Sequence, residues 1–111
     1  MNSTFETWTK EEFLTYVMLY AANADSHISA KEQKIIGTKA GEDIFEKMRE
    51  QFETDSDYDS LQNIIAYKNK YLQSENDVAD ILREVKSIFF TDNVFSDYEQ
   101  QVVFLIEKLL N

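Results

Sequence analysis

Four acidic residues occupy matching places in two short segments of the chain. Asp25 and Glu32 lie in the first segment, and Asp92 and Glu99 lie in the second. Carboxylate oxygens are the ligands that Ca²⁺ and Mg²⁺ prefer, and carboxylates held close together repel one another until a cation neutralises them. The four acids are therefore candidate ligands of a shared divalent-cation site, which His27 could extend towards a transition metal.

The same acids have a second interpretation that needs no ligand. Asp25 and Asp92 can each accept hydrogen bonds from the backbone amides of a turn. Glu32 and Glu99 each follow a serine by three positions. That spacing is typical of a capping box, in which the serine and the glutamate together satisfy the first amides of a helix. The residue pattern leaves the choice between a cation site and two capped helix starts open.

The two acidic segments belong to longer copies of one pattern. Residues 25–33 align with residues 92–100, and the Asp, Ser, Glu and Gln of the two copies coincide. Apolar positions outside these segments also stay in register, as Met18 does with Val85. This agreement predicts an internal repeat in which each copy is a helix, a tight loop and a second, capped helix.

Helical periodicity and capping signals extend along the whole chain. Thr9-Lys-Glu-Glu12 is a capping box, and Trp8 and Phe13 are placed as a hydrophobic staple around it. The spacing of apolar residues predicts about six helices with short connections. They are expected over roughly 9–24, 29–41, 44–52, 61–72, 74–89 and 96–110, with a polar loop at 55–60 whose Ser or Asp caps the next helix. The expected fold is an all-α, compact bundle that forms a single domain over residues 1–111.

Composition agrees with a helical fold and limits the classes of function. The 111 residues include no Pro and only 2 Gly, which suits helices better than a turn-rich β protein. The chain has no Cys and a single His, which leaves little for nucleophilic catalysis, and it has no glycine-rich phosphate loop. We therefore expect no enzymatic activity.

Charge and hydropathy bear on partners and location. The formal net charge of −10 disfavours nucleic acids and anionic membranes, because both reward clusters of Lys and Arg. It is compatible with a cation or with a basic protein surface. No apolar run approaches the roughly 18 residues of a membrane span, and no signal-peptide pattern is present. We expect a cytoplasmic protein without direct membrane insertion.

Tyrosines recur at helical spacing in two places. Tyr16 and Tyr20 share one face of the first helix, and Tyr67 and Tyr71 repeat the spacing in the fourth. Either pair is a candidate protein-contact patch, although such rings more often pack in a core or at its rim.

Residues 22–32, Ala-Asn-Ala-Asp-Ser-His-Ile-Ser-Ala-Lys-Glu, resemble the Ala-x-Ala-Asp-Gly-x-Ile-x-x-x-Glu signature of the TerB-like family, which is associated with tellurite resistance. Residues 89–99 are similar, and the family's two-copy arrangement would cover the chain from about Glu11 to Leu110. Ser26 and Asn93 stand where the family has Gly, and Asn tolerates a left-handed backbone more readily than Ser.

The resemblance implies an all-helical TerB-like fold and acids that bind metal, here Asp25, Glu32, Asp92 and Glu99. The family includes stand-alone stress proteins and the cytosolic module of a DnaJ-like co-chaperone, so it also implies interaction or sensing rather than catalysis. We therefore expect a non-enzymatic interaction module, a stress-associated scaffold or sensor with an unidentified protein partner. The alternative is a metal-responsive module that binds Ca²⁺ or Mg²⁺ through the same four acids.

Overall fold

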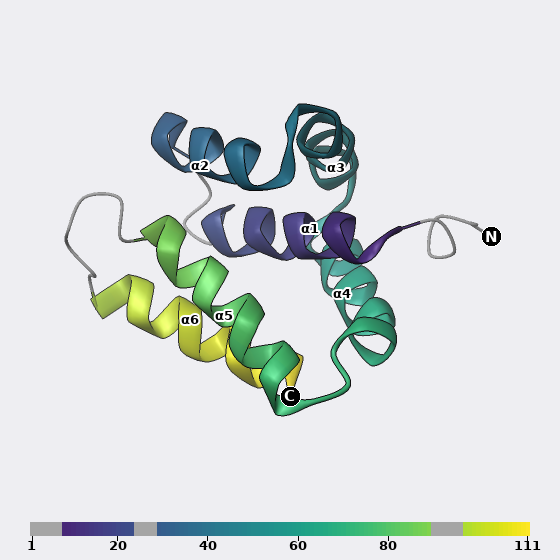
Figure 1. The fold of residues 1–111 in the computed structure, drawn as a ribbon, viewed down its shortest axis with the longest axis vertical. Coiled ribbons are helices and arrows are strands. Elements are labelled where there is room, and N and C mark those ends of the chain that lie inside the picture. The colour runs from purple at the N-terminus through teal and green to yellow at the C-terminus, as the bar shows by residue number, and fades with distance from the viewer. Residues whose placement is uncertain (1–7, 24–28, 90–96) are drawn as a thin grey trace.

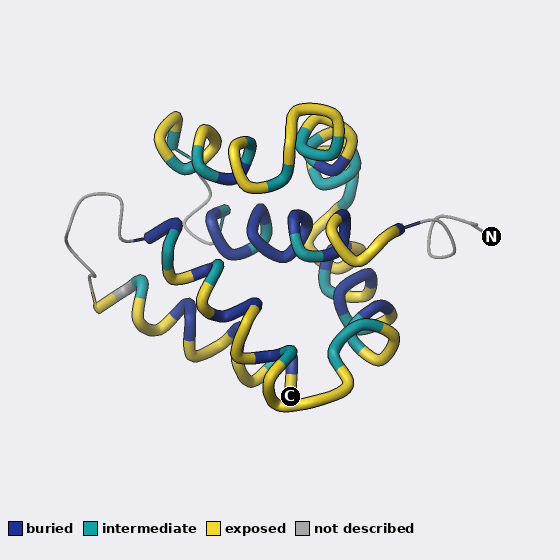
Figure 2. Tube along the Cα trace, in the orientation of Figure 1, coloured by how far each residue is buried: buried dark blue, intermediate teal, exposed yellow. Residues whose placement is uncertain are grey.

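Helix α1, Lys10–Ala22, is the central element of the computed structural model, which describes residues 8–23, 29–89 and 97–111. It packs against each of the other five described helices, and it is buried along nearly its whole length (Figures 1 and 2). Phe13, Tyr16, Val17 and Leu19 are completely buried although they point in different directions around the helix. A helix that is apolar on every side is stable only when other elements surround it.

The helices around α1 are α2 (Ala30–Ala40), α3 (Glu42–Thr54), α4 (Asp57–Tyr71), α5 (Glu75–Phe89) and α6 (Asp97–Leu110). In Figure 1, α2 lies on one side of α1 and α5 and α6 lie together on another, with α3 and α4 near its N-terminal end. The radius of gyration is 13.1 Å, close to the roughly 13 Å expected for a folded chain of this length. The described residues contain helices and no strand, which confirms the expected all-α, compact fold. No described helix is both long enough and apolar enough to cross a membrane.

Local signals in the sequence begin and end these helices. The Thr9 hydroxyl accepts a hydrogen bond from the amide of Glu12 at 3.1 Å, and the Glu12 carboxylate accepts one from the amide of Thr9 at 2.8 Å. These two bonds confirm the predicted capping box. Gly41 separates α2 from α3 with a φ of 91°. A residue with a side chain would be strained in that conformation, which explains why the break falls on glycine.

The segment 55–60, expected as a loop, is mostly helix. The Ser56 hydroxyl accepts the amide of Asp59 at 3.1 Å, and α4 begins at Asp57. Asp57 and Asp59 therefore lie in the first helical turn, where the partial positive charge of the helix N-terminus stabilises acidic side chains. The predicted cap is confirmed at Ser56, but the expected loop was too long, because acidic residues are typical both of loops and of the first turn of a helix.

Aromatic rings join α1 to α4. The Trp8 ring stacks on Tyr67 at a centroid distance of 4.7 Å and lies 4.7 Å from the ring of Tyr16. The Tyr71 hydroxyl donates to the Trp8 carbonyl at 2.6 Å. Tyr16 and Tyr67 are fully buried, so neither tyrosine pair forms an exposed patch; only Tyr20 and Tyr71 remain partly accessible. These rings lie in or at the edge of the core because burying each ring removes a large apolar area from water.

A buried polar network fixes the corner between α3 and α4 on α1. The Tyr16 hydroxyl donates to the Asp55 carboxylate at 2.7 Å and lies 2.9 Å from the hydroxyl of Ser60. Asn63 donates to the same carboxylate at 2.8 Å. Burial is the main cause that raises the pKa of Tyr16, and the negative charge of Asp55 adds to it, so the phenol remains a donor at neutral pH.

The two copies of the predicted repeat correspond to the pairs α1–α2 and α5–α6. Some apolar residues matched between the copies are buried in both, for example Met18 with Val85 and Ile36 with Val103. The predicted loops fall largely in residues 24–28 and 90–96, which lie outside the described residues. The repeat therefore stays a prediction.

The variant Tyr16→Phe tests the polar network. It leaves the buried Ser60 hydroxyl and the Asp55 carboxylate without their shared partner, so the free energy of unfolding should fall by about 1–3 kcal/mol. Urea unfolding followed by circular dichroism measures the change. The slope of the unfolding free energy against urea concentration should stay that of the wild type. Tyr58→Phe is the matched control, because Tyr58 is 70% exposed. A loss no larger than that of the control would contradict the assigned role.

Candidate functional site

The acids predicted as cation ligands are only partly within the described structure. Asp25, Asp92 and the adjacent His27 lie outside the described residues. Glu32 accepts the amide of Ser29 at 2.9 Å, and its own amide donates to the Ser29 hydroxyl at 3.1 Å, which confirms its capping role. In the described part of the chain, no group of three or more Asp, Glu or His side chains could hold a metal ion. The shared cation site stays a prediction.

A charged groove lies between α1, α2 and α5. Its cavity volume is about 520 Å³, and Leu14, Met18 and Ile81 contribute apolar side chains. Most of its charged groups are paired with one another across or along the helices. These pairs are Lys10–Asp77 at 3.9 Å, Lys39–Glu84 at 2.6 Å and Arg83–Asp80 at 3.0 Å. Because the protein satisfies these charges itself, the groove gains little from a charged ligand.

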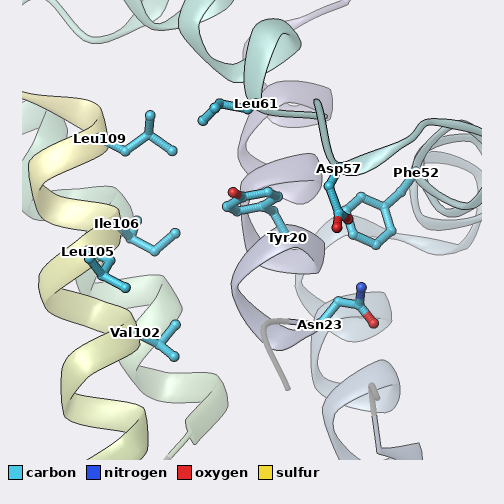
Figure 3. A pocket seen from close by; sticks show the side chains of 9 residues that line it. All are labelled: Tyr20, Asn23, Phe52, Asp57, Leu61, Val102, Leu105, Ile106 and Leu109. Carbon is cyan, nitrogen blue, oxygen red and sulfur yellow. The ribbon is translucent and has the colours of Figure 1, made fainter. Parts of the chain in front are cut away.

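A second groove, which we call the apolar groove, opens between α1, α3, α4 and α6. Its volume is about 460 Å³, within the range of roughly 300–1,000 Å³ found for ligand pockets. Figure 3 shows the α6 side chains on one side, Phe52 and Asp57 on the other, and Tyr20 between them. The lining residues are Tyr20, Asn23, Phe52, Asp57, Leu61, Val102, Leu105, Ile106 and Leu109.

Helix α6 supplies an apolar wall of this groove. Val102, Leu105, Ile106 and Leu109 follow the i, i+3, i+4, i+7 spacing of one helix face. They span about 10 Å along the helix axis. Leu105 is 63% exposed, so much of its side chain is in contact with water. Phe104 is also exposed, but it lies outside the groove and the Lys108 ammonium sits 4.7 Å from its ring centroid.

Two contacts set the width and the chemistry of the groove. Lys68 of α4 donates to the Leu109 carbonyl of α6 at 2.9 Å, which ties the two walls together. Tyr20 is half-buried on the floor, and its pKa is raised first by burial and then by the negative charge of Asp57. The Tyr20 phenol therefore keeps its proton and can donate a hydrogen bond into the groove.

Sequence reasoning identified members of the apolar groove but not the groove itself. Tyr20 was expected in a tyrosine pair, and Leu105 and Leu109 on the apolar face of the last helix. The available signal was the width of that face: Val102, Val103, Phe104, Leu105, Ile106, Leu109 and Leu110 extend beyond one core-facing stripe. A stripe of that width indicates that the helix has two contact surfaces.

Comparison with known proteins finds no protein-family model, curated protein or solved structure that matches this chain. The TerB-like interpretation therefore rests on residues 22–32 and 89–99 alone. The groove must be interpreted from its own geometry.

The variant Glu32→Gln separates capping from cation binding. The Gln side-chain oxygen can accept the same Ser29 amide, so the free energy of unfolding should stay within about 0.5 kcal/mol of the wild type in chelator. Glu32→Ala removes the bond and should cost about 0.5–2 kcal/mol. Urea titrations of the three proteins measure both changes, and an equal loss in Gln and Ala variants would argue against the capping role.

The cation hypothesis predicts a further difference between wild type and Glu32→Gln. A ligand present at about 100 times its Kd stabilises the folded protein by about 2.7 kcal/mol. Ca²⁺ or Mg²⁺ should therefore raise the melting temperature of the wild type and raise that of the variant less. Identical melting curves of the wild type in Ca²⁺, Mg²⁺ and chelator would eliminate the site.

Proposed function

We propose that this protein is a non-enzymatic, TerB-like interaction module, a stress-associated scaffold or sensor, that binds a helical segment of another protein in the apolar groove. The observation that carries the proposal is the α6 wall, where Leu105 is 63% exposed beside the partly buried Leu109 and above the buried Val102 and Ile106. Exposed apolar area of this kind is stabilised by burial against a partner.

The shape of the wall favours a helix as the bound element. Its four apolar residues cover about two helical turns at the spacing of one face. A partner helix with its own i, i+3, i+4, i+7 apolar residues would interdigitate with the accessible Leu105 and Leu109, as helices do when the ridges of one fill the grooves of the other. Tyr20 and Asn23 provide polar groups on the floor that would fix the orientation of the partner.

A binding role also fits the chemistry of the chain. With no Cys and one His, it has few nucleophiles and few groups that titrate near neutral pH. The pKa values of Tyr16 and Tyr20 are raised, which moves both phenols further from proton transfer at neutral pH. The TerB-like part of the proposal is supported by the two signature segments, residues 22–32 and 89–99.

Selection from a displayed library of helical peptides tests the groove. Peptides enriched on the wild type should carry an i, i+3, i+4, i+7 apolar stripe, and fluorescence anisotropy gives their Kd. Leu105→Glu places a charge in the apolar contact and should weaken binding at least about tenfold, equivalent to about 1.4 kcal/mol. Phe104→Glu is the matched control on the same helix and should change Kd less than about twofold, because Phe104 lies outside the groove.

Two outcomes would contradict the proposed function. One is the absence of any enriched peptide with an apolar stripe. The other is a peptide whose affinity falls equally in the Leu105 and Phe104 variants. Circular dichroism melting curves of both variants establish that a loss of binding does not reflect unfolding.

A further inference from the structure

Among the described residues, Asp57 is the one acidic side chain that lines the apolar groove. It lies in the first turn of α4, beside Phe52 and across the groove from the α6 wall (Figure 3). Its carboxylate is close enough to Tyr20 to raise the pKa of that phenol. Within the described part of the chain, the Asp57 side chain takes part in no ion pair or side-chain hydrogen bond. It is exposed and faces the space that a bound element would occupy.

The C-terminal ends of two helices lie on the same side of the groove as Asp57. Asn23, the C-cap of α1, lines the groove, and Phe52 belongs to the last turn of α3. Neither helix carries a basic residue in its last turn. The carbonyl ends of helices bear a partial negative charge, which basic residues usually offset. Here the partial charge at the end of α1 adds to the charge of Asp57, whereas that at the end of α3 is offset by the N-terminus of α4.

Two basic side chains of the helices that form the groove already have acceptors. Arg49 of α3 pairs with Glu46 at 2.6 Å and with Glu53 at 3.2 Å. Lys68 donates to the Leu109 carbonyl. Neither Arg49 nor Lys68 therefore neutralises the negative side of the groove, and a partner can supply a cation there.

The charge of the whole chain argues against a second copy as that partner. At a formal net charge of −10, two copies repel one another, whereas a basic segment is attracted over the Debye length. The apolar wall favours a helix with one apolar face, and the negative charge of the groove favours cations at the edge of that face.

We infer that the apolar groove selects an amphipathic helix of another protein that carries Lys or Arg at the edge of its apolar face, with that cation paired to Asp57. The inference rests on the proposed function. The apolar stripe of the partner packs on Leu105 and Leu109, the accessible residues of the α6 wall, while its basic edge lies over Asp57 and the C-terminal end of α1. Apolar contact provides most of the affinity, and Asp57 sets which charged edge is accepted.

Two synthetic peptides of about four helical turns test the inference. They share a Leu stripe at i, i+3, i+4 and i+7 and differ only in having Lys or Gln at the edge positions. The wild type should bind the Lys peptide roughly three- to tenfold more tightly by fluorescence anisotropy at low salt, and the preference should shrink at high salt. Asp57→Asn should abolish the preference by weakening the binding of the Lys peptide towards that of the Gln peptide.

Asp59→Asn is the matched control for Asp57→Asn. Asp59 lies in the same first turn of α4 and carries the same charge, but it does not line the groove. The preference for the Lys peptide should survive in this variant with less than about a twofold change, because more distant surface charges are screened by salt. An equal loss in both variants would overturn the pairing with Asp57.

The outcomes separate this inference from the proposed function. Equal, Leu105-dependent binding of both peptides overturns the charge selection and supports the groove as a helix site. If the protein binds neither peptide and also enriches no helical peptide from the library, both this inference and the proposed function are overturned. A concentration-dependent dimer in sedimentation velocity that Leu105→Glu dissociates would assign the groove to a second copy. If a simple alkylammonium ion saturates the apolar groove with the affinity of the Lys peptide, the groove is a small-ligand pocket. Either the dimer or this binding of a small cation would overturn the inference.

Discussion

The burial of α1 is the constraint on which the rest of the structure depends. Its apolar residues point in all directions, so the other five described helices must surround it to remove them from water. The enclosure is incomplete near the C-terminal end, where Tyr20 and Asn23 stay partly accessible while Leu19 and Ala22 are buried. The apolar groove lies over these two residues, so it follows from how α1 is covered.

The polar network around Tyr16 connects the stability of the fold to the geometry of the groove. Tyr16 holds Asp55 at the corner between α3 and α4, and Asn63 donates to the same carboxylate from within α4. Phe52 lies just before this corner and Asp57 just after it. Because the corner is fixed on α1, the wall that faces α6 has a defined position.

Helix α6 contributes side chains both to the core and to the apolar groove. Val103 and Leu110 are buried in the core, whereas Leu105 projects into the groove and is largely exposed. The helix packs mainly on α5 and makes smaller contacts with α1 and α4, which leaves room between α6 and α4 for another element. Lys68 bridges this space at the Leu109 carbonyl and keeps the two helices in register.

Local patterns in the sequence determined the helices, because capping boxes and apolar periodicity act within a few residues of one another. Thr9, Ser29 and Gly41 mark helix boundaries that the structure reproduces, and the all-α class follows from them. Local patterns could not separate the loop acids expected at 55–60 from first-turn acids, since both interpretations use the same residue types.

Only the tertiary structure decided which apolar residues enter the core and which line the groove. Leu105 and Ile106 are neighbours of similar hydrophobicity, yet one is exposed and the other buried. Their difference depends on where α1, α4 and α5 lie around α6, and no local pattern encodes that arrangement. The placement of Asp57 opposite α6 has the same origin, because it joins residues far apart in the chain through the packing of α1.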